Sequence, residues 1–382
     1  MRKIGILTYY HDSVNYGGNL QAYALCKKLE KMGYSAEQIC FDPNAPTSPS
    51  GIKEKIIDRL RRIKNAFRSL RITKDKNKSR TEKVISDRKK AFEHFNKEMI
   101  SHSEKVYVSS DIAETNEKYQ CFIAGSDQIW NPKWYVPSYF LDFVKADNIK
   151  TSYATSFGIT EFSSEQKELI KKHLNDFAAV SLREDCGIYK ELFGKEVEVC
   201  VDPTLLLSRE EWLEVTAPKM IDEKYIFCYF FGDDCASRKI AMEYSIKNKI
   251  KIVTIPHLNG VNVLDDYFGD IQMPSASPEE FLSLINNAEC VFTDSFHAVV
   301  FSQIFKRKYF VFQRNKKDVI SSRIFSITKL FNSEKFFCYN NERLSMDYIE
   351  SVPCLDYSID NENLNLLIKK SELYLHNIVE MR

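Results

Sequence analysis

Short apolar runs that end in polar or glycine residues and are followed by helical patterns recur along most of this chain. The first run spans residues 4–10, and after a loop at 11–18 a helix is expected from Asn19 to Met32, stopped by Gly33. A second apolar run, at 36–41, ends in Asp42-Pro43. This strand–helix–strand order favours parallel pairing, because two parallel neighbours need a crossover connection between them. The chain is therefore expected to fold around open parallel sheets.

The pattern falls into two blocks, separated by a plausible linker at 213–223. The first block holds further strands at 119–124, 152–156, 179–182 and 197–201 and a helix at 165–177. The second holds strands at 225–231, 251–255, 290–293 and 309–312 and helices from 278 and at 298–305. With 382 residues, of which 44% are hydrophobic, the chain has material for two cores. We predict an α/β fold of two Rossmann-like domains that face a cleft, at 1–212 and 224–350, with a C-terminal amphipathic helix at 361–382.

A basic helical insertion is expected in the first domain, at about 51–100. Residues 51–90 hold 16 Lys or Arg against 5 Asp or Glu, a local net charge of +11. Apolar residues recur at three- and four-residue steps over 52–71, which predicts an amphipathic helix, whereas 74–90 is nearly all polar and indicates a mobile loop or a solvated helix. The helix at 52–71 either packs on its domain or lies on an anionic membrane surface.

Composition argues against several classes of function. The net charge is +1, so no attraction to nucleic acid is expected. Ten scattered cysteines form no Cys-x-x-Cys, and the acidic pairs at 233–234 and 265–266 lack the Asp-x-Asp spacing of a metal–diphosphate site, so neither metal nor cofactor is expected. No apolar stretch approaches the roughly 18 to 20 residues that cross a bilayer, and the run at 4–10 is too short for a secretory signal. A cytoplasmic protein is expected.

Polar residues that directly follow the expected strands are the candidate ligand contacts. Open parallel sheets bind ligands beyond the carboxyl ends of their strands. The candidates at these positions are Gly17, Gly18, Asn19, Ser126, Asp127, Gln128, Arg183, Ser295 and His297. The loop that leads into the first helix matches neither Gly-x-Gly-x-x-Gly nor a Walker loop, which gives nucleotide binding little support. His11 and His257 also follow strands, but their surroundings give no further signal.

Seven phrases, in order, resemble the polysaccharide pyruvyl transferase family. They lie at 4–8 (IGILT), 15–25 (NYGGNLQAYAL), 122–131 (FIAGSDQIWN), 153–158 (YATSFG), 181–184 (SLRE), 201–207 (VDPTLLL) and 293–298 (TDSFHA). The resemblance covers about 1–335 without the basic segment 51–100. It implies a glycosyltransferase-B-like fold, phosphoenolpyruvate as donor, and a sugar acceptor that receives pyruvate as a cyclic ketal during capsule, cell-wall or exopolysaccharide assembly. The acceptor is either a free glycan or one carried on a lipid.

Ketal formation suggests a role for each candidate. A proton must reach the methylene carbon of the donor, and His297 is the expected general acid, because imidazole titrates near neutral pH. Arg183 and Arg323, together with Gly17, Gly18, Asn19 and Ser295, are expected to bind the donor's phosphate and carboxylate. Asp127 is expected to deprotonate or orient the acceptor hydroxyl, with Ser126 and Gln128 as acceptor contacts. The competing interpretations are a core histidine, a structural ion pair of Arg183 with Glu184 or another acid, tight-turn glycines and a capping Asp127.

Two other functions stay open. A sugar-nucleotide glycosyltransferase has a similar architecture, although the second block shows no evident ribose-binding acid and no glycine-rich diphosphate loop. A non-catalytic glycan-assembly protein could keep the fold, although His297 and Arg183 argue against this. Donor binding would discriminate among the three functions.

Overall fold

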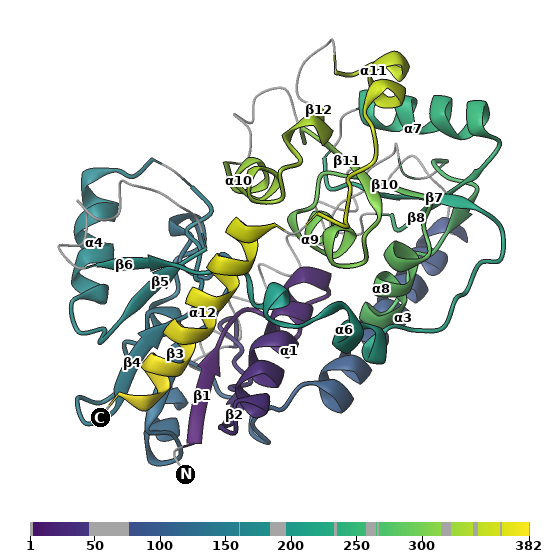
Figure 1. The fold of residues 1–382 in the computed structure, drawn as a ribbon. Helices are drawn as coiled ribbons and strands as arrows, with labels where there is room; N and C mark the ends of the chain where they lie inside the picture. Colours follow the sequence, from purple (N-terminus) through teal and green to yellow (C-terminus); the bar gives the residue numbers. More distant parts are fainter. Residues whose placement is uncertain are drawn as a thin grey trace.

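The computed structural model describes residues 3–45, 76–159, 161–183, 196–232, 235–256, 265, 267–314, 322–338, 343–359 and 361–381. These residues form two main parallel sheets that lie in different halves of the molecule, with helices around both (Figure 1). The predicted α/β class with parallel sheets is confirmed. Predicted segment 52–71 lies outside the described residues, as do Glu184 and His257.

The first sheet has the strand order β2-β1-β3-β4, and each neighbouring pair is parallel. Its strands are β1 (Lys3–Leu7), β2 (Ser35–Gln38), β3 (Cys121–Ala124) and β4 (Ile149–Ser152). A parallel pair, β5 (Val180–Leu182) and β6 (Val197–Val199), continues it through isolated bridges from Thr151 to Ala179 and from Thr155 to Leu182. The carboxyl ends of β1, β3 and β5 therefore open on the same edge.

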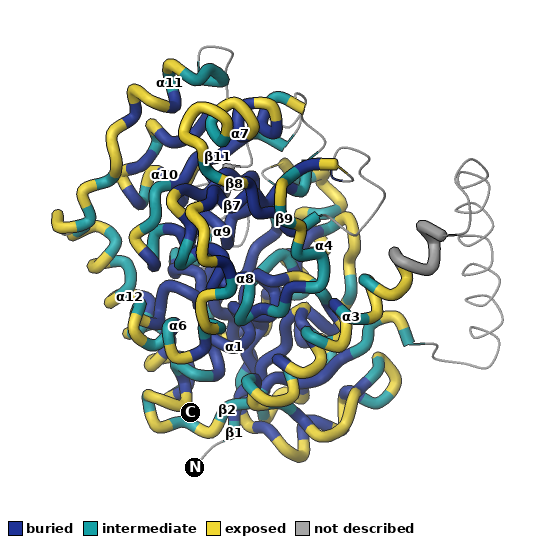
Figure 2. The backbone as a smooth tube through the Cα atoms, turned by 90° about the vertical axis from the view of Figure 1, so that its right-hand side faces the viewer, coloured by how far each residue is buried: buried dark blue, intermediate teal, exposed yellow. Residues whose placement is uncertain are grey.

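The second sheet has the order β12-β11-β10-β7-β8-β9, again with parallel neighbours. Its strands are β7 (Tyr225–Tyr229), β8 (Lys251–Thr254), β9 (Ile271–Gln272), β10 (Cys290–Thr293), β11 (Lys308–Phe312) and β12 (Phe337–Cys338). Both sheets lie in the buried interior, whereas the outer helices carry most of the exposed residues (Figure 2).

The helices follow the expected order, with several additions. The α-helices are α1 (Tyr16–Lys31), α3 (Lys76–Met99), α4 (Ser164–Leu174), α6 (Arg209–Val215), α7 (Cys235–Asn248), α8 (Pro278–Asn286), α9 (Phe296–Ile304), α10 (Ser322–Leu330), α11 (Met346–Ser351) and α12 (Glu362–Glu380). The 3-10 helices are η1 (Ile112–Glu117), η2 (Pro132–Trp134), η3 (Pro137–Phe140), η4 (Pro203–Leu206) and η6 (Glu334–Phe336). The predicted linker at 213–223 begins inside α6. Within the described ranges, no helix is long and apolar enough to cross a membrane.

Two helices begin earlier than the sequence predicted. α1 begins at Tyr16 instead of Asn19, because the Asn15 side chain accepts a hydrogen bond from the Gly18 N–H as its N-cap. α9 begins at Phe296 instead of 298, because Ser295 caps it in the same way. Gly17, Gly18 and His297 therefore lie in first helical turns and not in loops.

The part of the basic segment that the structure describes is a helix with a buried face. In α3, Arg88, Phe92 and Phe95 are at most 5% exposed. The Arg88 guanidinium lies 4.9 Å from the ring centre of Tyr16, and the Arg88 Nη1 donates to the Pro256 carbonyl. Of the two alternatives predicted for 74–90, a mobile loop or a solvated helix, the structure shows a helix from residue 76 onward, and its residues 82–90 are largely exposed apart from the buried Arg88. α3 packs on α8 of the other half.

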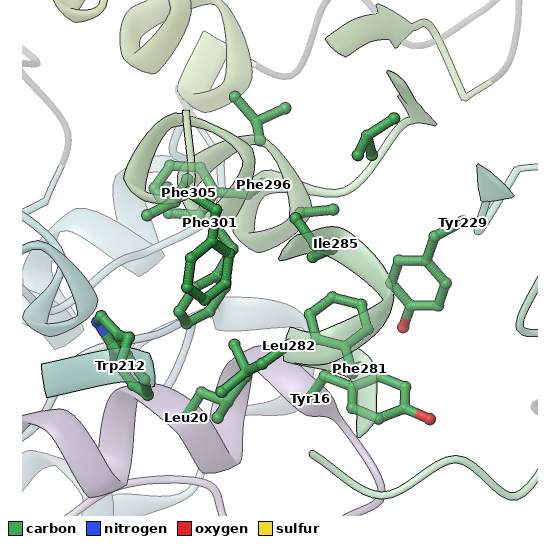
Figure 3. Packing of buried hydrophobic residues seen from close by; sticks show 14 of the residues in the cluster. Tyr16, Leu20, Trp212, Tyr229, Phe281, Leu282, Ile285, Phe296, Phe301 and Phe305 are labelled. Atoms are coloured by element: carbon green, nitrogen blue, oxygen red, sulfur yellow. The ribbon is translucent and has the colours of Figure 1, made fainter. Parts of the chain in front are cut away.

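An aromatic core joins the two halves (Figure 3). The Tyr16 ring of α1 stacks on the Phe281 ring of α8, with 4.4 Å between their centres. Trp212 of α6 meets the edge of Phe301 of α9 at 4.8 Å. The Tyr16 hydroxyl donates to the Ala276 carbonyl at 2.7 Å, and burial raises the pKa of Tyr16 to about 12. These contacts hold the first turn of α1 against the second half.

Candidate functional site

Asp202 provides a buried carboxylate that contacts both halves of the molecule. It follows β6, is 1% exposed, and caps η4: its Oδ1 accepts hydrogen bonds from the Thr204 N–H at 3.0 Å and hydroxyl at 2.7 Å. Its Oδ2 accepts a hydrogen bond from Arg183 Nη1 at 2.6 Å and lies 3.4 Å from His297 Nε2. One oxygen therefore joins a cation of the first half to an imidazole of the second.

The charge of Asp202 is held by its partners. Burial alone would raise the pKa of this carboxyl, but the charges of His297 and Arg183 and the hydrogen bond from Thr204 outweigh burial. The pKa of Asp202 consequently lies well below its usual value. Asp202 is therefore an anion throughout the neutral range.

Arg183 connects Asp202 to Asp127. It directly follows β5, and its side chain is 4% exposed. Besides the ion pair with Asp202, its Nη2 lies 3.6 Å from Asp127 Oδ1. Its guanidinium also lies 4.4 Å from the ring centre of Phe296, in the first turn of α9. The sequence left open a structural ion pair of Arg183 with Glu184 or another acid. Glu184 lies outside the described residues, and the structure shows ion pairs with Asp202 and Asp127.

His297 lies against the first turn of α1. A Cβ atom added to Gly17 would lie 1.9 Å from His297 Nδ1, so only glycine leaves space for the imidazole at this position. The other ring nitrogen, Nε2, faces Asp202. The ring, which belongs to the second half, is thus held between a helix terminus and a carboxylate of the first half, which suits a group that gives and takes a proton.

Three helix N-termini meet at this point. α1 and α9 touch through Gly17 and His297, and Asp202 is the N-cap of η4, which contacts both of these helices. The unpaired N–H groups and the dipole of a helix N-terminus favour bound anions. The arrangement therefore suits a bound anion in addition to the carboxylate of Asp202.

Asp127 follows β3 in a left-handed conformation with φ 74°, which is uncommon for a residue other than glycine. Its Oδ1 accepts a hydrogen bond from the Gln128 N–H at 2.9 Å, and its Oδ2 would lie 3.7 Å from a Cβ atom on Gly18. Asp127 therefore lies at the same edge as Arg183 and the start of α1. Strained backbone of this kind is often kept at functional sites.

Several predicted contacts have structural roles instead. The Asn19 side chain is fully buried and donates to the Ser13 and Asn15 carbonyls, so it shapes the loop before α1. The Ser126 hydroxyl is fully buried and donates to the Ala154 carbonyl. Ser295 caps α9 with its hydroxyl. These three residues support the site from behind, where the sequence predicted direct ligand contacts.

The remaining predicted residues lie around this centre. The Gln128 Oε1 accepts a hydrogen bond from Asn131 Nδ2. Arg323 lies in the first turn of α10, and its side chain lies outside what the structure describes. His11, which the sequence left without a role, lines a pocket of about 340 Å³ between the loop before α1, helix α3 and residues 102–106.

Sequence reasoning missed two charged residues at the site. Asp202 stood within the quoted phrase at 201–207 without a role, although it is a polar residue just beyond a strand. Arg314 follows β11; its Nε donates to the Asp294 carbonyl at 3.2 Å, and its guanidinium lies 4.7 Å from the Phe231 ring centre. Its side chain is 38% exposed. The signal that could have found Arg314 is its position two residues beyond β11. β11 pairs with β10, the strand that leads into the helix of His297.

Asp294 fixes the strand ends around Arg314. Its two carboxylate oxygens accept hydrogen bonds from the N–H groups of Phe231 at 2.8 Å and Gly232 at 2.7 Å. Burial raises the pKa of Asp294, against the opposing effect of Arg314. The carboxyl ends of β7, β10 and β11 are thereby held together beside α9.

Comparison with known proteins places these features in a family. The family model for polysaccharide pyruvyl transferase matches residues 15–315, which include Arg183, Asp202, His297 and Arg314. A comparison with curated proteins found no significant match.

Solved structures share the fold. The UDP-GlcNAc 2-epimerase from Methanocaldococcus jannaschii matches over 99% of both chains with a TM-score of 0.55 and 14% identity. The UDP-GlcNAc 2-epimerase from Neisseria meningitidis bound to UDP-GlcNAc matches over 99% of both chains, with a TM-score of 0.50 and 9% identity. A putative UDP-N-acetylglucosamine 2-epimerase from Listeria monocytogenes matches over 96% of this chain and 90% of its own, with a TM-score of 0.51 and 10% identity. The predicted glycosyltransferase-B-like fold is confirmed.

Proposed function

Because this chain belongs to the polysaccharide pyruvyl transferase family, we propose that it moves pyruvate from phosphoenolpyruvate to a sugar of a glycan as a cyclic ketal. The observation that supports this best is the contact of Arg183 and His297 with one oxygen of Asp202. It places a fixed cation and a proton-transfer group together where helix N-termini meet. That combination is what a phosphorylated enol acid requires.

The donor carries a phosphate and a carboxylate, and both need cations or N–H donors. The first turns of α1 and α9 supply N–H groups, and Arg183 supplies a guanidinium from the first half. Arg314, partly exposed beside Asp294, supplies a second guanidinium from the other half. Arg323 is proposed as a further anion contact. No metal ion or cofactor is part of the proposal.

The chemistry begins with proton transfer. His297 donates a proton to the C3 methylene carbon, which uses the electron pair of the C2–C3 double bond and leaves C2 electrophilic. A sugar hydroxyl then bonds to C2 and releases its proton, and the C2–O bond to phosphate breaks with its electron pair on phosphate. A second hydroxyl bonds to C2 and closes the ring. One released proton restores His297, and the other leaves with phosphate.

Two carboxylates have distinct places in this sequence. Asp202 stabilises the protonated imidazole before proton transfer, because it lies 3.4 Å from Nε2. Asp127 is the proposed acceptor of the hydroxyl proton, since it lies at the same edge of the first sheet and is paired with Arg183. Gln128 is a proposed acceptor contact next to it.

The proposed acceptor is a glycan, either free or carried on a lipid. The basic segment 52–71 suits peripheral contact with the anionic inner face of a membrane. A cytoplasmic location is proposed, because phosphoenolpyruvate is an intracellular metabolite.

The test is pyruvate transfer in D2O. Phosphoenolpyruvate and a panel of hexose glycosides and oligosaccharides are incubated with the protein, and products are followed by NMR and by phosphate release. We expect a ketal whose methyl group is CH2D, because C3 gains one hydron from solvent through His297. His297→Gln should lower the rate by about 10²–10⁴-fold, while the exposed control Lys27→Ala should not.

Two outcomes would contradict the proposed function. Turnover of a UDP-sugar without consumption of phosphoenolpyruvate would assign the chain to the sugar-nucleotide glycosyltransferases. A folded protein that consumes neither donor would favour the non-catalytic assembly protein.

A further inference from the structure

We propose that the indole of Trp134 is a stacking platform for a sugar ring of the acceptor, beside Asp127. This inference rests on the proposed function, since it assumes a glycan acceptor. The chain has three tryptophans, of which Trp130 and Trp212 are at most 1% exposed, whereas Trp134 is 57% exposed. Of the three, Trp134 alone presents its ring to solvent, at the edge of the candidate site, where the ring is available to a ligand.

Trp134 is exposed but held in place. It ends η2, whose N-cap Asn131 accepts a hydrogen bond from the Lys133 N–H at 3.0 Å. Its indole N–H donates to the Gln128 carbonyl at 3.4 Å, so the polar edge of the ring is satisfied. Trp130, stacked on Phe140, fixes the start of this segment in the core. The platform is therefore preorganised, which reduces the entropy lost on binding.

A short series of contacts links Trp134 to the reacting groups. The residue that accepts its indole hydrogen bond, Gln128, also donates its N–H to Asp127 Oδ1. Asp127 in turn faces Arg183, which is paired with Asp202. A sugar on Trp134 would thus lie next to the proposed base, and its hydroxyls would point toward carboxylate and amide oxygens.

A second exposed aromatic residue borders the same carboxylate. Tyr9 is 44% exposed, and a Cβ atom on Gly18 would lie close to both its carbonyl oxygen and Asp127. Burial, followed by the negative charges of Asp12, Asp127 and Asp42, raises the pKa of Tyr9, so its hydroxyl stays protonated and able to donate. Aromatic faces that alternate with carboxylates suit a sugar, which offers a C–H face and hydroxyl donors.

The surroundings favour a sugar over a protein or a membrane. A protein or lipid surface would need a broad contiguous apolar patch. Trp134 instead has Lys133 on one side and on the other Tyr135, whose hydroxyl bonds to His173 Nε2. The exposed apolar area here is limited to the neighbouring rings of Trp134 and Tyr135, and the polar group of each ring is hydrogen-bonded.

The experiment uses Trp134 as its own reporter. Because the other two tryptophans are buried, iodide quenches chiefly the emission of Trp134. The probes are the methyl glycosides of glucose, galactose, mannose, N-acetylglucosamine and N-acetylmannosamine, and saturation-transfer NMR measures the same binding in the variants. We expect at least one glycoside to protect Trp134 from iodide. Its dissociation constant should rise about tenfold in Trp134→Ala and much less in Trp134→Phe.

Control variants and outcomes separate this inference from the proposed donor chemistry. Tyr267→Ala, which removes a ring 95% exposed in the other half, should leave glycoside binding unchanged. Phosphoenolpyruvate binding should be the same in all of these variants. A glycoside that binds at Trp134 without any consumption of phosphoenolpyruvate would support the platform and contradict only the donor. No glycoside protection, protection only by lipid vesicles, or equal glycoside affinity in Trp134→Ala would overturn the platform.

Discussion

The buried Asp202 carboxylate sets the positions and charges of the groups around it. Its side chain is fully enclosed, pairs with Arg183 just after β5 and faces the imidazole of α9, so moving either partner removes a charge contact from a buried carboxylate. Breaking a buried pair in this way costs more than a surface pair contributes. In the proposed mechanism, catalysis and stability therefore depend on the same oxygen atom.

The first prediction concerns the acid dependence of stability. The folded-state pKa of Asp202 lies below its unfolded value of about 3.8. The ionised carboxylate therefore contributes fully to the free energy of unfolding above the unfolded pKa, and this contribution is lost as the pH falls through the folded pKa. Asp202→Asn should lower the free energy of unfolding by about 3 kcal/mol at pH 7. The difference from the wild type should shrink below about pH 4.

Urea titrations between pH 3 and pH 7 measure this difference. Glu210→Gln, which neutralises a carboxylate whose side chain is 77% exposed, is the matched control and should change stability little at any pH. A penalty for Asp202→Asn that stays constant down to pH 3 would mean that the ionised carboxylate does not stabilise the fold.

Single residues were predicted unevenly from the sequence. His297, Arg183 and Asp127 stand just beyond strands in phrases typical of the family, and the structure brings them together around Asp202. Their catalytic roles stay predictions. Asp202 itself was missed, because an Asp-Pro after a strand resembles an ordinary turn and cap. Asn19 and Ser126 were assigned to ligands because sequence position alone does not tell which side chains point inward.

Helices α1 and α9 bring the two halves into contact at their first turns. Their N-caps, Asn15 and Ser295, start each helix two or three residues before the apolar periodicity does. That shift puts Gly17 against the His297 ring. The periodicity shows which face is buried, but the cap determines where the helix begins.

Gly17→Ala tests this contact. Alanine favours a helix over glycine by about 1 kcal/mol, so α1 itself should not be weakened. The new methyl group would overlap the imidazole and should displace it from Asp202. NMR signals of His297, assigned with His297→Gln, should shift, and transfer activity should fall about tenfold or more. Lys27→Ala in the same helix is the control; unchanged His297 signals in Gly17→Ala would contradict the geometry.

Other elements show why the sequence-based assignment was incomplete. Most strands were located to within a few residues, because buried parallel strands are nearly continuous apolar runs, whereas the two-residue strands β9 and β12 were not predicted. α7 was missed, since few of its residues are buried and its sequence is mostly polar. The buried face of α3 was not predicted, because Phe92 and Phe95 pack on rings of α1 and Arg88 bonds to the Pro256 carbonyl of the other half, and tertiary contacts of this kind leave no local signal.

At the scale of the whole molecule, the two sheets are joined by packing as well as by chain connections. Aromatic rings of α1, α6, α8 and α9 form one core across the junction (Figure 3). α12 follows the second sheet in sequence but packs on the first, where the Tyr374 hydroxyl donates to the Ser152 carbonyl and the Ser371 hydroxyl accepts from the Val201 N–H (Figure 1). The sequence predicted this helix, but nothing in its periodicity indicates which half it covers.

The central claim is that groups of both halves form one site for phosphoenolpyruvate around Asp202. Calorimetric titration of phosphoenolpyruvate and, in parallel, UDP-GlcNAc tests it most directly, with wild type, Arg183→Lys and Arg314→Ala. The account predicts that phosphoenolpyruvate binds the wild type, that each substitution weakens binding about tenfold or more because a guanidinium is lost from either half, and that UDP-GlcNAc does not bind. Binding of UDP-GlcNAc without phosphoenolpyruvate, or phosphoenolpyruvate binding that is indifferent to both substitutions, would contradict it.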